Sequence, residues 1–212
     1  MTTMTHFKTV ALFFKLLAAL TLALLSLGAS AEPYFIHKDG AMVLDKATGL
    51  QWMRCSLGQK WNGSTCTGQA KASDSYAAQH AAKNINATGG FNGHSDWRLP
   101  TVPELLTLRL CSTGFANDKT DIKDGGEPVN QLCNRESEEP TLALQVFPSS
   151  LRYYRTSSPF AGSNDNWVVG FSNGYPFSSG ERPNYDFYVR LVRASNLSSD
   201  ASALGFITLG MV

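Results

Sequence analysis

The fold of this chain is decided by one stretch, Gly93-His94-Ser95-Asp96-Trp97-Arg98-Leu99-Pro100-Thr101-Val102-Pro103-Glu104-Leu105. Trp97 and Leu99 alternate with polar neighbours, which predicts a half-buried strand. The proline that follows disfavours the helical conformation at the residue before it, so the strand should end there. Thr101 and Glu104 have the spacing of a capping box, in which each side chain accepts a hydrogen bond from the other residue's backbone N–H. The stretch therefore predicts a strand that runs directly into a helix over residues 101–111.

Apolar patterning elsewhere predicts one further helix and several strands. Small apolar residues recur at helical spacing over residues 69–85, and a Gly pair at 89–90 stops the pattern. Both faces of the last strand carry apolar residues, so we expect it to be central, and an Asn-Gly step at 172–174 is expected to turn into it. The predicted strands cover residues 35–37, 42–44, 50–53, 153–158, 167–171 and 185–193.

Residues 1–31 have the features of a secretory signal peptide. Two lysines precede an apolar run over residues 16–27, and a small-x-small cleavage motif follows at residues 29–31. The apolar run is too short to span a bilayer comfortably, which argues against the alternative of a retained membrane anchor. We expect a mature chain that begins at Glu32 and is periplasmic, secreted or at the cell surface, with no membrane span.

The charge balance argues against a general polyanion-binding protein. The 212 residues include 18 Lys and Arg against 17 Asp and Glu, for a net charge of +1. Residues 1–31 contain two of the lysines and no acid, which leaves 16 against 17 and a net charge of −1 in the mature chain. Such a chain is not expected to bind nucleic acid. The composition, 43% apolar and 17% charged, suits one globular domain over residues 32–193 and a flexible tail over 194–212.

The four cysteines of the chain are Cys55, Cys66, Cys111 and Cys133, an even number that indicates two disulfides in an exported protein. Three pairings are open. We prefer 55–66 and 111–133, because each closes a short loop rich in Gly, Asn, Ser and Asp. A zinc site is the alternative, but no Cys-x-x-Cys pair is present. We expect Trp61 to fold under its own loop; the alternative is an exposed platform on which a sugar ring stacks.

Three motifs resemble a known family. They are Asp-Trp-Arg-Leu-Pro-Thr-x-x-Glu-Leu at residues 96–105, Thr-Ser-Ser at 156–158 and Val-Arg-x-Val-Arg at 189–193. Together they look like the C-terminal domain of the Legionella collagen-like adhesins, over roughly residues 40–193. The resemblance implies an α+β, C-type-lectin-like fold, with two main helices packed on a small antiparallel sheet and long irregular disulfide-stapled loops. Directly before Thr156, where Trp or another residue is more usual in the family, this chain has Arg155.

The resemblance also implies a non-catalytic, adhesin-like module that binds sulfated or other polysaccharides at the cell surface. Arginine pairs with sulfate through two donors, and aromatic rings stack on sugar faces. The candidate ligand-binding residues are Arg152, Arg155, Trp167, Tyr175, Arg182 and Arg190. The alternative role for the arginines is ion pairing with the nearby acids Asp165, Glu181 and Asp186.

A different class of function is a structural subunit that contacts another surface or periplasmic protein. A large exposed apolar patch around residues 167–175 would favour this second class. The sequence does not indicate an oligomeric state.

Catalytic motifs are absent from the sequence. It contains no Gly-x-Ser-x-Gly, no phosphate-binding loop and no His-Glu-x-x-His, and the three histidines beyond residue 31 are isolated. We therefore expect no enzymatic activity, no cofactor and no metal. The one alternative is Ca²⁺ near Asp118, Asp121 and Asp124, whose carboxylates suit that ion but lack EF-hand spacing. Most acidic loops of this kind are simply solvated.

Overall fold

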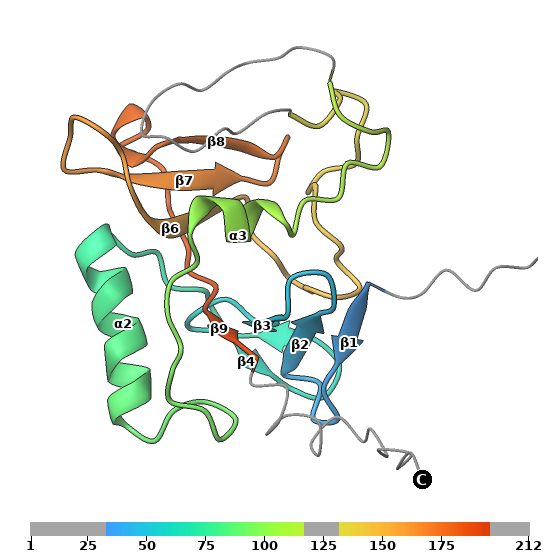
Figure 1. Ribbon diagram of the computed structural model, residues 1–212, viewed down its shortest axis with the longest axis vertical. Helices are drawn as coiled ribbons and strands as arrows, with labels where there is room; N and C mark the ends of the chain where they lie inside the picture. The colour runs from blue at the N-terminus through green and yellow to red at the C-terminus, as the bar shows by residue number, and fades with distance from the viewer. Residues whose placement is uncertain (1–32, 117–131, 196–212) are drawn as a thin grey trace, which may run out of the picture. The chain divides into compact units, whose positions relative to one another are not determined.

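The computed structural model describes residues 33–116 and 132–195, and its regular structure is mostly β (Figure 1). Three small sheets are accompanied by two α-helices, α2 (Ser75–Ala87) and α3 (Val102–Leu106), and by the 3₁₀ helix η1 (Ser179–Glu181). Only α2, with 13 residues, is longer than a turn or two. The expectation of a C-type-lectin-like fold with two main helices on one sheet is therefore wrong for the described part of the chain.

The first sheet contains β1 (Tyr34–Ile36), β2 (Met42–Asp45), β3 (Leu50–Met53) and β9 (Val192–Ala194), antiparallel and in that order. The three strands expected before residue 54 are thus confirmed to within a residue or two. Both faces of this sheet are covered. Val43 and Trp52 belong to a core cluster with α3, whereas Met42 and Met53 belong to a cluster with α2.

The turn between β2 and β3 has the structure that its sequence predicts. The carboxylate of Asp45 accepts a hydrogen bond from the Ala47 N–H at 2.9 Å and another from the Thr48 hydroxyl at 2.8 Å. Gly49 closes the turn at a φ of 70°, a conformation that glycine adopts without steric cost. The Asx turn expected here is confirmed.

The other two sheets are a short ribbon and a three-stranded sheet. The ribbon pairs β4 (Lys60–Trp61) with β5 (Cys66–Thr67), and the larger sheet has the order β6 (Tyr153–Pro159), β7 (Asn166–Gly170) and β8 (Tyr175–Ser178). The turn at 172–174 leads into β8 rather than into the final strand. β8 was not predicted from the sequence. It contains Pro176, which a strand tolerates at the edge of a sheet.

The predicted strand 185–193 is regular only at its end, in β9. Its earlier carbonyls accept hydrogen bonds from the backbone of three different segments, at Met53, Leu57 and Ser73. On its other side, Tyr188 exchanges backbone hydrogen bonds with β6 at Tyr153 and Arg155. The segment is therefore central, as expected, but its backbone hydrogen bonds go to several short segments and not to one long partner strand.

Trp97 is a core residue with 2% of its surface exposed. Asn86 of α2 holds its backbone from both sides, accepting from the Trp97 N–H at 3.0 Å and donating to the Trp97 carbonyl at 2.8 Å. The next residue, Arg98, forms a bridge with Val192 of β9. The segment around Trp97 thus lies between α2 and the first sheet, although it forms this bridge in place of a regular strand.

The capping box of α3 is confirmed. The Glu104 carboxylate accepts from the Thr101 N–H at 2.8 Å, and the Glu104 N–H donates to the Thr101 hydroxyl at 3.4 Å. The helix nevertheless ends at Leu106 and does not reach residue 111. The Leu110 N–H donates instead to the Thr141 carbonyl, and Leu108 is buried in the core, so tertiary contacts override the helical pattern.

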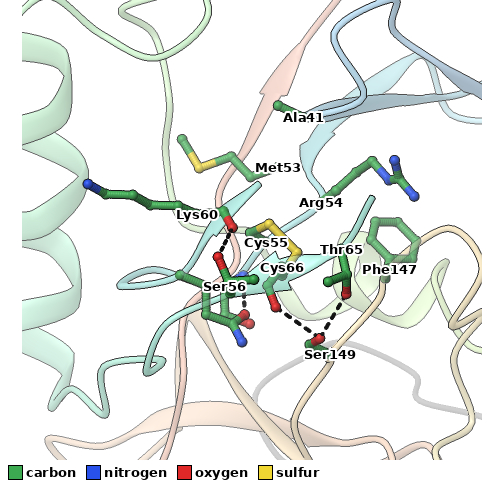
Figure 2. The surroundings of a disulfide bond; sticks show 12 residues. Ala41, Met53, Arg54, Cys55, Ser56, Lys60, Thr65, Cys66, Phe147 and Ser149 are labelled. Carbon is green, nitrogen blue, oxygen red and sulfur yellow. Dashed lines mark hydrogen bonds between the residues drawn. A yellow bond between two sulfur atoms is a disulfide. The ribbon is translucent and has the colours of Figure 1, made fainter. Parts of the chain in front are cut away.

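Both disulfides have the preferred pairing, Cys55–Cys66 and Cys111–Cys133. Figure 2 shows the first of them, with the Ser149 hydroxyl bonded to the Cys66 carbonyl at 3.1 Å. The loop closed by this disulfide is thereby attached to the segment that precedes β6. No free cysteine is found in the described residues.

Arg98 and Glu104 form an ion pair with a shortest N–O distance of 2.6 Å. This pair should make the stability of the fold depend on pH. Burial raises the pKa of Glu104, but hydrogen bonds from Arg98 and Thr101 outweigh burial and hold it below the usual 4.5. The pair therefore stabilises the fold above pH 4.5, and this stabilisation is lost as pH falls through the lower folded pKa. In urea denaturation, Glu104→Gln should destabilise at pH 7 and approach the wild type near about pH 3.

The control for this prediction is Glu136→Gln, because Glu136 is exposed and forms none of the ion pairs among the described residues. It should leave the difference in stability between the two pH values unchanged. If the stability of Glu104→Gln depended on pH as the wild type does, the ionisation of Glu104 would not contribute to the pH dependence of folding.

Candidate functional site

Three of the six residues expected to bind ligand are buried. Arg190 is 1% exposed, Trp167 is 4% exposed and Arg155 is 7% exposed. They cannot present a surface to a polysaccharide in this conformation. The other three, Arg152, Tyr175 and Arg182, retain contact with solvent. The binding role itself stays a prediction, and burial restricts it to these exposed members and their neighbours.

Arg190 is a buried connector. Its guanidinium donates to the Met53 carbonyl at 2.8 Å, to the Arg54 carbonyl, to the Ser150 hydroxyl at 2.8 Å and to the Tyr154 hydroxyl at 3.2 Å. These acceptors come from the first sheet, from the segment before β6 and from β6 itself. One side chain thus joins three parts of the chain that few regular hydrogen bonds connect.

Arg54 repeats this arrangement beside Arg190. Its guanidinium donates to three backbone carbonyls, of Val146 at 2.6 Å, Gly40 at 2.7 Å and Gln145 at 3.1 Å. Burial and the nearby charge of Arg190 both lower the pKa of Arg54. Within residues 33–116 and 132–195, neither arginine forms an ion pair with a carboxylate. The interior therefore contains two positive charges that backbone and hydroxyl oxygens solvate.

The hydroxyl of Tyr154 lies at the centre of this arrangement. It accepts from the Leu151 N–H at 3.0 Å and lies 2.7 Å from the Ser56 hydroxyl, next to Arg190. Burial raises the pKa of Tyr154, but the charge of Arg190 and these hydrogen bonds outweigh burial and lower it. The side chains of Ser56, Tyr154 and Arg190 form one buried network of hydrogen bonds, in which each member depends on the others.

Arg155 and Trp167 are also structural. Arg155 donates to the Ser73 carbonyl and, at 3.1 Å, to the Ser75 hydroxyl at the start of α2, and its guanidinium lies 4.7 Å from the ring of Phe187. The cationic side chain of Arg155 therefore packs on an aromatic ring. Trp167 packs edge-on against Phe160.

The exposed candidates adjoin a cluster of rings that we call the aromatic–arginine face, defined as Arg152, Tyr153, Tyr175, Arg182 and Tyr185. The guanidinium of Arg182 lies 5.2 Å from the ring of Tyr185 and 5.9 Å from that of Tyr153. The two tyrosine rings are 5.1 Å apart and tilted by 31°. Tyr175 stacks on Phe177 with an interplanar angle of 10°. Tyr153 and Tyr185 were not among the predicted ligand-binding residues, although Tyr153 directly follows Arg152.

A hollow of about 360 Å³ opens beside these rings. It is lined by Leu151, Arg152, Tyr153, Asn184, Tyr185, Asp186 and Tyr188. Its charge is mixed, because Arg152 lies 3.6 Å from Glu139 and Asp186 is an exposed acid. Arg182 makes no ion pair among the described residues. Arg182 is thus the cation on this face with the most freedom to meet an anionic group.

The described residues offer no metal site and no membrane-spanning helix. No group of three or more His, Cys, Asp or Glu is placed to hold an ion there. No helix of the described part is long and apolar enough to cross a bilayer. The possible calcium ligands Asp118, Asp121 and Asp124, the predicted signal peptide and residues 196–212 of the predicted tail lie outside the described residues.

Comparison with known proteins identifies the class. The family model described as the Lcl C-terminal domain matches residues 41–193, so the chain belongs to that family of adhesin-related surface domains. No curated protein and no solved structure gives a significant match. The two disulfides agree with an exported chain, because such bonds persist in oxidising compartments.

Removal of the buried guanidinium should be costly. Arg190→Met removes one donor from each of two carbonyls and two hydroxyls. Each of these buried groups that is left unsatisfied costs about 1–3 kcal/mol. We therefore expect a loss of roughly 3 kcal/mol or more in the free energy of unfolding, measured by urea denaturation. The matched control is Arg182→Met, which removes an exposed arginine and should change stability by about 0.5 kcal/mol or less. Equal losses in the two variants would refute the structural role of Arg190.

Proposed function

We propose that this chain is a non-catalytic module that binds polysaccharide, sulfated or otherwise, at the cell surface through the aromatic–arginine face. Membership of an adhesin-related family supports a binding role. The observation that carries the choice of surface is the exposed guanidinium of Arg182, which lies over aromatic rings beside a hollow. Tyrosine rings offer apolar area to the faces of sugar rings and a hydroxyl to their polar edges.

The charges on this face favour a chain with occasional anionic groups over a dense polyanion. Arg182 can pair with a sulfate or carboxylate through two parallel hydrogen bonds. Arg152 would first have to leave Glu139, an exposed pair that contributes little to stability. Asp186 repels anions at the edge of the hollow. We therefore expect stacking and hydrogen bonding to contribute as much as charge.

Retention on a heparin column tests the charged part of this proposal. Arg152→Ala combined with Arg182→Ala should elute at lower salt than the wild type, because two cations of the face are removed. The matched control, Lys38→Ala with Lys83→Ala, removes the same charge from exposed positions outside the face and should elute close to the wild type. Equal shifts in both double variants would indicate non-specific attraction and overturn this assignment.

A glycan array with Tyr153→Ala and Tyr185→Ala tests the stacking part. Loss of signal for neutral and sulfated glycans alike is expected, since the rings contact the sugar whatever its charge. An array without any glycan signal for the wild type would favour the protein-binding alternative. The apolar patch that would support that alternative is not found at residues 167–171, because the residues there are buried.

A further inference from the structure

A second concavity lies away from the aromatic–arginine face and shares none of its residues. It has a volume of about 740 Å³, within the range of small-molecule sites. Its lining combines the turn between β1 and β2, the loop closed by the Cys55–Cys66 disulfide and the loop after α2. We call it the disulfide cleft. Its main apolar lining residues are Met53, Leu57, Trp61, Ile85 and Phe91.

The walls of the disulfide cleft are fixed before any ligand arrives. Trp61 lies against the backbone at Gly40, where a Cβ atom would come within 2.7 Å of the indole nitrogen, and the Arg54 guanidinium lies 4.3 Å from the ring. Trp61 was expected to fold under its own loop, whereas the ring packs on the backbone of the turn between β1 and β2. Across the cleft, the Asn92 side chain donates to the Asp39 carboxylate and joins two of the loops.

The positive charges around the disulfide cleft are incompletely balanced. Lys60 and Lys71 are exposed on its lining and form no ion pair among the described residues. Figure 2 shows Lys60 and Met53 extending to the same side of the disulfide. Behind the lining, Arg54 and Arg190 carry buried charges that have no carboxylate partner among the described residues. The one acid of the lining is Asp39, which Asn92 and a backbone N–H already engage.

We propose that the disulfide cleft binds a small amphipathic anion, of which a medium-chain carboxylate is the simplest example. The apolar lining would take the hydrocarbon body and exclude water from it, which favours binding in proportion to the area buried. The carboxylate would lie at the rim between Lys60 and Lys71, where the field of the buried arginines adds to theirs. A cation of the same shape would be repelled by Lys60 and Lys71 at the rim and by the arginines behind the lining, so the site should select by the sign of the charge.

Decanoate and decyltrimethylammonium are matched probes, because they share a ten-carbon chain and differ in the sign of the head group. Methionine methyl groups labelled with ¹³C report the location by NMR. Decanoate should shift the methyl signal of Met53, which lines the cleft, and leave that of Met42, which does not. Affinity for decyltrimethylammonium should be weaker by about tenfold or more.

Lys60→Met with Lys71→Met keeps the apolar stems and removes the charges. It should weaken decanoate binding by about tenfold while the Met53 spectrum without ligand stays that of a folded protein. The control pair Lys38→Met with Lys83→Met should bind decanoate as the wild type does. The proposal is overturned by the absence of a Met53 shift at about 10 mM decanoate, by equal affinity for the two probes, or by unchanged affinity in the Lys60 and Lys71 variant.

Discussion

The constraint on which the structure depends is the solvation of buried backbone carbonyls by arginine. Regular elements are short here, so many carbonyl groups inside the domain have no partner in a helix or a long strand, and a buried carbonyl without a donor is costly. Arg190 and Arg54 supply five hydrogen bonds to backbone carbonyls, which belong to Gly40, Met53, Arg54, Gln145 and Val146. Their planar, multi-donor geometry suits this task better than the single ammonium of lysine.

This constraint also decides what the surface can do. Arginines that hold the interior are removed from ligand binding, which leaves Arg152 and Arg182 to serve the aromatic–arginine face. The same interior charges raise the positive potential behind the disulfide cleft, where Lys60 and Lys71 lie at the rim. The two proposed anion sites lie on separate surfaces, the tyrosine-rich aromatic–arginine face and the mainly apolar disulfide cleft.

Local features of the fold followed from the sequence, whereas its architecture did not. The cap at Thr101, the Asx turn at Asp45, the disulfides and the burial of Trp97 depend on short spacings that a sequence displays directly. The early end of α3 and the shared partners of residues 185–193 depend on contacts between distant segments, which periodicity does not encode. For the same reason, the arginines near the end of the sequence looked like a surface cluster.

One sign in the sequence does indicate that Arg190 is buried, because Arg190 lies in a predicted strand with apolar residues on both faces. The hydrogen exchange of arginine side-chain protons, followed by ¹⁵N NMR, measures that burial most directly. Arg190 and Arg54 should give resolved guanidinium signals whose exchange is slower than that of Arg182 by roughly a hundredfold or more, because exchange requires the interior to open. Guanidinium protons of Arg190 that exchange as fast as those of Arg182 would contradict the burial of Arg190 and its role in solvating interior carbonyls.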